Sequence, residues 1–438
     1  MADPIGQLPD AKLIYDWNTA GNGYPHREHP VELNDETLRD GLQSPSVRDP
    51  NIETKIELLH LMDRLGIHSV DLGLPGAGPR ACADITALCR TIVEQRLSIR
   101  PNCAVRTVKS DITPLVEISM KVGVPIEAAA FIGSSPIRQF AEDWTLDDML
   151  RLTEEAVAYA VSQGLPVMYV TEDTCRATPE TIKRLYCTAI NAGAKRICVC
   201  DTVGHITPRG VRNLVPYVRQ MIKETGEDIK IDWHGHNDRG LGVINTITAM
   251  TSGVDRVHAT ALGVGERIGN CSMDQLLVNL RLMGYIDNDL TALNDYVRIA
   301  SEATEVPIPV NYPVFGRDAF RTATGVHAAA IIKARRKGED WLADRIYSGV
   351  PAGMVGRHQE IEVGFMSGMS NVVFWLHEHG IKPEQHLVEA IFTAAKERNR
   401  VLNDEELMEI VKYETTKRDQ SLPMDTLEAW KQEIEGTR

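Results

Sequence analysis

The chain has 438 residues, of which 43% are hydrophobic and 25% charged, an ordinary composition for a globular protein and enough for a barrel with an appended region. Its formal net charge of −14 argues against nucleic acid as a partner, because phosphate binding calls for a basic surface. There is no apolar run of about 18 residues and no signal-peptide pattern over Met1–Ala20, so we expect no membrane partner. The eight cysteines, most of them in apolar stretches, indicate reduced core thiols and a cytoplasmic protein.

Short strand-like runs alternate with helical segments over the first part of the chain. Eight strands, each followed by a helix, in roughly 250 residues are typical of a (β/α)8 TIM barrel of the α/β class. The alternative, an open doubly wound sheet, requires a Gly-rich phosphate loop after the first strand, and none is present. The predicted strands are Val31–Thr37, Ser69–Pro75, Ile99–Val105, Ile126–Gly133, Pro166–Glu172, Arg196–Thr202, Ile229–His236 and Arg256–Gly263.

The pattern changes after about Met283, where helical segments dominate and residues 335–370 are glycine-rich and irregular. We therefore expect an arm over 1–27, a catalytic barrel over 28–285 and a mainly helical C-terminal subdomain over 286–438. The helices predicted there are Leu290–Thr304, Ala319–Lys333, Val372–His379, Gln385–Arg398, Asp404–Thr415 and Asp425–Glu435.

His234 and His236 lie two residues apart at the end of the seventh predicted strand. That spacing puts both imidazoles on one face of the strand, and the active site of such a barrel lies at the C-terminal ends of its strands. Asp40 follows the first strand and adds a carboxylate, and Asn270 follows the eighth. Two histidines and one carboxylate predict a divalent metal site that suits Zn, Mn, Fe, Co and, less well, Mg. The alternative, two strand histidines with ordinary hydrogen bonds, is disfavoured by this position in the barrel.

Arg39 precedes the predicted ligand Asp40. A guanidinium at that place can stabilise a developing enolate or alkoxide oxygen. The alternative interpretation is an Arg–Asp surface pair. Two further polar pairs close the fifth and sixth strands, Glu172-Asp173 and Asp201-Thr202.

These motifs together resemble the DRE-TIM metallolyase superfamily, which includes 2-isopropylmalate, homocitrate and citramalate synthases and HMG-CoA lyase. The matching segments are Asp35–Gln43, His234–Asp238 and Thr260–Asn270, with weaker matches at Glu172-Asp173 and Asp201–Gly204. The resemblance implies a TIM barrel that carries a divalent metal. It implies these roles: Asp40, His234 and His236 as metal ligands with Asn270 close by, Arg39 as the electrostatic catalyst, Gln43 beside the metal and Thr202 against the bound 2-oxo acid.

The helical region carries a second resemblance. Thr324–His327 is similar to the element with which isopropylmalate and homocitrate synthases bring a histidine from the helical subdomain into the active site. It implies that His327, together with Glu172, does the acid–base work. Ile346-Tyr347 resembles the synthase segment that follows, and this places Tyr347 among the substrate-binding residues.

The reaction that the resemblance implies is condensation of acetyl-CoA, or another acyl-CoA, with a 2-oxo acid, catalysed by a homodimer without a regulatory domain. Two alternatives stay open. The triplet Gly41-Leu42-Gln43 is nearer to HMG-CoA lyase, which would run a retro-aldol cleavage of a 3-hydroxyacyl-CoA. The second alternative is a non-catalytic barrel that only binds a metal or a ligand, and the intact motif residues disfavour it.

The sequence departs from the synthase pattern on the fourth and fifth strands. Ala129 stands where many synthases have a histidine, and Val170 where a serine is common. These replacements predict a roomier, less polar pocket, and thus a branched or aromatic 2-oxo acid. Arg138 is the competing feature, because it could receive a second carboxylate bidentately.

Overall fold

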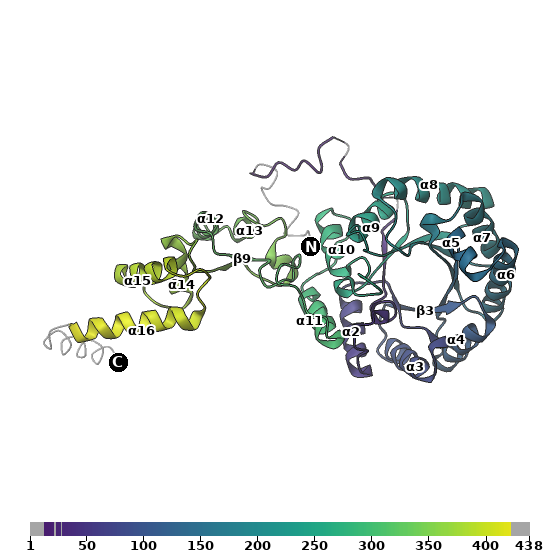
Figure 1. Ribbon diagram of the computed structural model, residues 1–438, viewed down its shortest axis with the longest axis horizontal. Helices are drawn as coiled ribbons and strands as arrows, with labels where there is room; N and C mark the ends of the chain where they lie inside the picture. Colours follow the sequence, from purple (N-terminus) through teal and green to yellow (C-terminus); the bar gives the residue numbers. More distant parts are fainter. Residues whose placement is uncertain (1–12, 22, 28, 422–438) are drawn as a thin grey trace. The chain divides into compact units, whose positions relative to one another are not determined.

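A computed structural model describes residues 13–21, 23–27 and 29–421 (Figure 1). The chain divides into two compact units, Met1–Pro307 and Ile308–Arg438. The predicted arm over 1–27 is described only from residue 13 onward, without residue 22, and the predicted helix Asp425–Glu435 lies outside the described residues.

The first unit is a closed barrel of eight parallel strands in chain order, with helices around it (Figure 1). The TIM barrel predicted from the sequence is therefore confirmed, and each observed strand falls within one residue of its predicted start. The strands are β1 (Glu32–Asp35), β2 (Ser69–Asp71), β3 (Arg100–Arg106), β4 (Glu127–Gly133), β5 (Val167–Glu172), β6 (Arg196–Asp201), β7 (Lys230–Gly235) and β8 (Arg256–Ala259).

Helices return the chain from the end of each strand to the start of the next one. Their beginnings are set by local chemistry: Asn51 accepts a hydrogen bond from the Thr54 N–H at the start of the first of them, and Thr145 forms a capping box with Asp148. The helices are α2 (Ile52–Arg64), α3 (Pro79–Glu94), α4 (Lys109–Val122), α5 (Pro136–Glu142), α6 (Leu146–Ser162), α7 (Pro179–Asn191), α8 (Pro208–Thr225), α9 (Gly242–Thr251) and α10 (Met273–Leu282).

One further helix, α11 (Leu293–Thr304), also belongs to the first unit, which extends to Pro307 and so beyond the expected barrel end at 285. Its Tyr296 is fully buried and donates its hydroxyl hydrogen to the Asp35 carboxylate on β1, with 2.5 Å between the oxygens. This contact ties α11 to the first strand.

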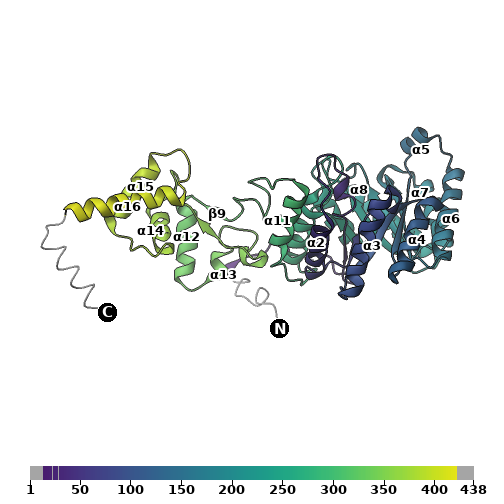
Figure 2. The ribbon, with the colours of Figure 1, turned by 90° about the horizontal axis from the view of Figure 1, so that it is seen from below.

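The second unit is mainly helical, as Figure 2 shows for α12 (Gly325–Arg336), α14 (Met369–Glu378), α15 (Gln385–Lys396) and α16 (Asp404–Ser421). Its core gathers apolar side chains such as Val372, Leu376 and Ile391. The helix expected over Ala319–Lys333 begins later than predicted, because Arg321-Thr322 (β9) pairs in parallel with Glu360-Ile361 (β10). The short helix α13 (Asp340–Ala343) lies in the irregular stretch.

In the described part of the chain, no helix combines the length and the apolar character that crossing a membrane requires.

Candidate active site

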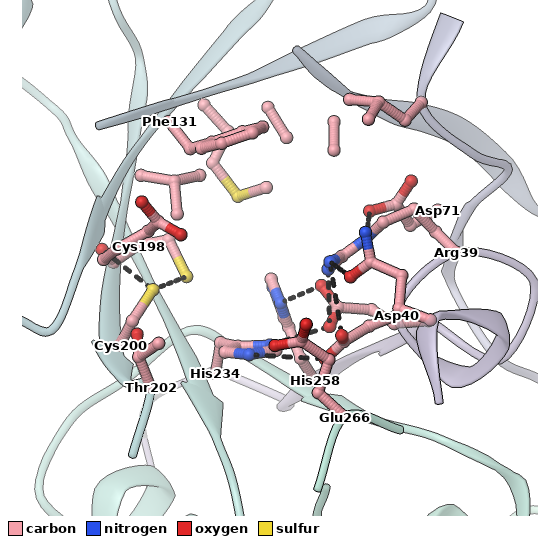
Figure 3. A pocket seen from close by; sticks show the side chains of 18 of the residues that line it. Arg39, Asp40, Asp71, Phe131, Cys198, Cys200, Thr202, His234, His258 and Glu266 are labelled. Atoms are coloured by element: carbon pink, nitrogen blue, oxygen red, sulfur yellow. Dashed lines mark hydrogen bonds and ion pairs between the residues drawn. The ribbon is translucent and has the colours of Figure 1, made fainter. Parts of the chain in front are cut away.

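A cavity of about 220 Å³ opens at the C-terminal ends of the barrel strands, where the sequence places its polar motifs. All eight strands or the turns after them contribute to its walls, and the ribbon and side chains are seen in Figure 3. Charged and polar residues form one side, and apolar residues form the other.

The three predicted metal ligands come together at this cavity. His234 Nε2 lies 3.7 Å and His236 Nε2 lies 3.5 Å from Asp40 Oδ2, and all three residues are buried. Asp40 stands on the turn after β1, and the two histidines stand at and just after the end of β7. Asp40 and two histidines that follow it by at least 194 positions in the sequence thus form a group that could hold a metal ion.

The donor set fits a divalent cation. The distances from Asp40 Oδ2 to the two imidazoles are too long for hydrogen bonds, and this buried oxygen has no hydrogen-bond partner among the described residues. A buried carboxylate oxygen without a partner is costly unless something else satisfies it. Burial, together with the neighbouring His234, lowers the pKa of His236 to about 4, which keeps that imidazole neutral and able to donate a lone pair.

Asn270 is held beside these ligands through its main chain, which forms an isolated bridge with His236. Its side-chain nitrogen donates to the Val264 carbonyl at 3.2 Å. The amide oxygen is buried and finds no hydrogen-bond partner within the described residues. An unsatisfied oxygen at that position suits the role of a further ligand.

Arg39 reaches into the cavity between three carboxylates. Its Nε donates to Asp71 Oδ2 at 2.8 Å, and its Nη atoms lie 3.1 Å from Glu36 and 3.6 Å from Asp40. Burial opposes the charge, but these carboxylates raise the pKa of Arg39 well above its usual value. The alternative of a simple surface pair does not match this geometry, since only 17% of the side chain is exposed.

Three other predicted site residues line the same cavity: Gln43, Glu172 and Thr202. Gln43 Oε1 accepts from Arg39 Nη1 at 3.5 Å, and the Thr202 hydroxyl oxygen accepts from the Asp173 N–H at 2.8 Å. Burial raises the pKa of Glu172, and the positive charges of Arg138 and Arg39 only partly offset this. A carboxyl with a raised pKa exchanges protons more readily near neutral pH.

The sequence did not single out Glu36, Asp71 or His258, yet all three line the cavity. Glu36 accepts a hydrogen bond from His234 Nδ1 at 2.7 Å and another from His258 Nδ1 at 2.8 Å. Burial lowers and the Glu36 charge raises the pKa of His258, with a net rise to about 10. The signal that could have found His258 is its two-residue spacing from Arg256, which matches the spacing of Asp232 and His234 on the neighbouring strand.

The opposite side of the cavity is apolar. Figure 3 shows Cys198 across the cavity from Arg39 and Asp71. Ala129 and Val170 both line it, as the alternation of side chains along β4 and β5 predicts. The other apolar lining residues are Leu74, Ala104, Phe131, Met168 and Cys200.

Of the three remaining predicted substrate or catalytic residues, Arg138 belongs to the first unit and the other two belong to the second. Arg138 stands on α5, pairs with Glu142 at 3.1 Å, and is not among the described residues that line the cavity. His327 and Tyr347 belong to the second unit, where their rings stack with centroids 4.0 Å apart. Their roles at the active site stay predictions.

Residues 30–301 match the family described as HMGL-like, so the match covers most of the chain and all eight barrel strands. The chain belongs to the HMGL-like family. The homocitrate synthase AksA of Methanopyrus kandleri is 30% identical to this HMGL-like protein over 390 residues, which are 87% of this chain and 92% of that one. The 2-isopropylmalate synthase of Sulfolobus acidocaldarius is 30% identical over 354 residues, 80% of this chain and 86% of that one. The resemblance seen in the motifs is thereby confirmed.

Among solved structures, the hydroxymethylglutaryl-CoA lyase of Pseudomonas aeruginosa superposes with a TM-score of 0.53 at 18% identity. The superposition covers 66% of this HMGL-like chain and 96% of the lyase. At that identity the likeness concerns the fold alone, and it agrees with the barrel described above.

Proposed function

We propose that this protein is an acyltransferase that condenses acetyl-CoA, or another acyl-CoA, with a 2-oxo acid to give a 2-alkylmalate-type product and free CoA. The observation that carries the proposal is the convergence of Asp40, His234 and His236 beside Arg39 in one buried cavity. The homocitrate and 2-isopropylmalate synthases that match most of the chain support this reaction over others of the family.

The proposed reaction forms a carbon–carbon bond and then hydrolyses a thioester. The methyl group of acetyl-CoA loses a proton to a base, and its carbon bonds to the keto carbon of the 2-oxo acid. The keto oxygen takes up a proton and becomes a hydroxyl. Water then cleaves the C–S bond of the thioester, which leaves a carboxylate and releases the thiol of CoA.

Asp40, His234, His236 and Asn270 would hold the divalent cation, which when bound supplies Lewis-acid polarisation of a carbonyl oxygen. Arg39 stabilises negative charge that develops on oxygen, because its guanidinium is held in place by three carboxylates and needs no reorganisation. Glu172, with its raised pKa, is the proton-transfer group of the barrel, and His327 is its predicted partner. Thr202 and Gln43 bind and orient the 2-oxo acid.

We further propose that the 2-oxo acid carries an apolar side chain. Apart from Glu172, the residues of β3 to β6 that line the cavity are uncharged, Ala129 and Val170 among them, and no described cation stands there. Arg138, the candidate receptor for a second carboxylate, does not line the cavity and is paired with Glu142, although its charge acts on Glu172. A dicarboxylic substrate would therefore desolvate its second charge without compensation, whereas an apolar group gains burial.

The experiment is a thiol-release assay with acetyl-CoA and a panel of 2-oxo acids: oxaloacetate, 2-oxoglutarate, 2-oxoisovalerate, pyruvate and phenylpyruvate. We expect the branched or aromatic members to give the highest kcat/KM. Preference for a dicarboxylic 2-oxo acid that Arg138→Ala abolishes would assign specificity to Arg138 and overturn the apolar-substrate proposal.

The second candidate function is retro-aldol cleavage of a 3-hydroxyacyl-CoA, which the triplet Gly41-Leu42-Gln43 favours. The same preparation tests it. Cleavage of a 3-hydroxyacyl-CoA without thiol release from any member of the panel would replace the condensation proposal by this one.

A further inference from the structure

A continuous run of hydrogen bonds leads from the predicted metal ligand His234 into the closed interior of the barrel. His234 Nδ1 donates to Glu36 Oε2 at 2.7 Å, and His258 Nδ1 donates to Glu36 Oε1 at 2.8 Å. His258 Nε2 donates to Asp232 Oδ2 at 2.7 Å. Glu36, His258 and Asp232 are at most 4% exposed.

The far end of this run is fixed by arginines. Arg256 Nε donates to Asp232 Oδ2 at 2.5 Å, and Arg196 Nη1 donates to Asp232 Oδ1 at 2.7 Å. Arg256 in turn donates to Glu127 Oε2 at 2.5 Å. Because His258 is held on its other side by Asp232, the barrel interior fixes one oxygen of the Glu36 carboxylate, and Arg39 lies 3.1 Å from the other.

The two nitrogens of His258 both face carboxylate oxygens, so both carry hydrogens. This arrangement matters for Glu36, since His258 occupies one of its oxygens and directs the other toward His234. Figure 3 shows His258 and His234 side by side at the floor of the cavity, with Asp40 next to them.

Glu36, His234 and His258 form a second group of potential metal ligands. Their contacts argue against a metal there. The nitrogen–oxygen distances of 2.7 and 2.8 Å are those of charge-assisted hydrogen bonds, and His258 uses its remaining nitrogen for Asp232. With a hydrogen on each Nδ1, neither imidazole nitrogen that faces Glu36 has a lone pair for a cation.

We propose that Glu36 is a positioning residue for the metal site: it holds His234 in the tautomer with hydrogen on Nδ1, so that the Nε2 lone pair points toward Asp40 and His236. The inference rests on the proposed metal site, and it adds a residue that the motif resemblance did not supply. A carboxylate behind a ligating imidazole fixes the ring and makes the ligand more basic. His258 and Asp232 extend this support by keeping Glu36 in place.

The test measures Co²⁺ binding to the full-length protein by visible absorption, with no turnover required. We expect Glu36→Ala to raise the dissociation constant roughly 10- to 100-fold and to alter the absorption bands, because the His234 ring is no longer held. Glu36→Gln should have a smaller effect, since its amide oxygen can still accept the His234 Nδ1 hydrogen. This conservative variant also serves if Glu36→Ala fails to fold.

Glu32→Ala is the matched control. Glu32 lies on β1 four residues earlier, on the same face of the strand. It pairs with Arg100 at 2.7 Å and with Arg196 at 3.2 Å, and with no histidine. The Glu32→Ala variant also removes one negative charge, so it should lower thermal stability without changing Co²⁺ affinity. A merely structural role of Glu36 predicts the same pattern for both variants.

Three outcomes are decisive. The inference would be overturned if Glu36→Ala bound Co²⁺ with the same affinity as Glu32→Ala. If only Glu36→Gln folds, the same comparison applies to that variant. Affinity unchanged in Asp40→Ala would remove the metal site itself and the inference with it. A Glu36 effect together with no condensation of any 2-oxo acid would sink the proposed function but leave the positioning role intact.

Discussion

The interior of this barrel has two halves of opposite character. At the cavity, strands β1, β7 and β8 with the turns after them contribute Glu36, His234 and His258 with their charged partners. Strands β3 to β6 contribute mainly Ala129, Val170 and similar side chains, with Glu172 as their charged lining residue. Barrel interiors are usually filled with branched apolar residues throughout. The difference teaches that charged side chains are concentrated where a cation and an oxyanion would bind. The part of the wall where a substrate side chain would lie is largely apolar.

The charged half is most severely disrupted by removing a metal ligand. His234→Ala or His236→Ala takes one of three converging donors from the site. We expect metal binding to weaken by more than the roughly 100-fold that loss of an outer partner costs, and turnover to be lost. Metal content after dialysis and initial rates check this. Full metal occupancy with an unchanged rate in both variants would mean that the site lies elsewhere.

Arg39→Ala tests the same half without removing a predicted metal ligand. The charge it stabilises develops in the transition state, so kcat should fall by about 10²- to 10³-fold while KM changes little. Steady-state kinetics and a metal-binding titration separate the two effects. Arg39→Lys should not restore the rate, because an ammonium cannot keep contacts to Asp71, Glu36 and Asp40 together. An effect confined to KM would make Arg39 a binding residue.

A larger side chain in the apolar half tests whether this wall determines substrate specificity. Ala129→Leu adds volume opposite the metal ligands, so kcat/KM for a branched 2-oxo acid should fall about 10-fold relative to pyruvate. Val170→Ala changes the volume in the opposite direction and should favour the largest substrates. Equal changes for pyruvate and for the branched acid in both variants would show that this wall does not contact the side chain.

The smallest expected effect concerns stability against pH. The pKa of His258 is raised to about 10 in the fold, against about 6.5 in an unfolded chain. Its contribution to stability is therefore complete below pH 6.5 and is lost as the pH rises toward and through 10. Melting temperatures of the metal-free protein from pH 6.5 to 10 should fall more steeply for the wild type than for His258→Gln, by about 2–4 °C. Parallel curves would show that His258 is not charged in the fold.

The sequence determined the barrel and the centre of the candidate site. Apolar runs bounded by helical segments locate eight strands, since a parallel strand covered on both faces must be apolar along its length. The spacing of His234 and His236 places them on one face, and the C-terminal ends of strands in such a barrel meet at one rim. These two rules are enough to bring Asp40 to the histidines across a wide gap in sequence.

Only the tertiary structure decided which way neighbouring polar residues point. Asp35 and Glu36 are adjacent acids, yet Asp35 bonds outward to Tyr296 and Glu36 faces the interior to hold His234 and His258. Local propensity cannot distinguish them, because the inward face of β1 is set by its register with β8, where Asn34 pairs with His258 and Asp35 with Ala259. The contact between Glu36 and His258 joins residues 222 positions apart, and barrel closure is what brings them within 2.8 Å.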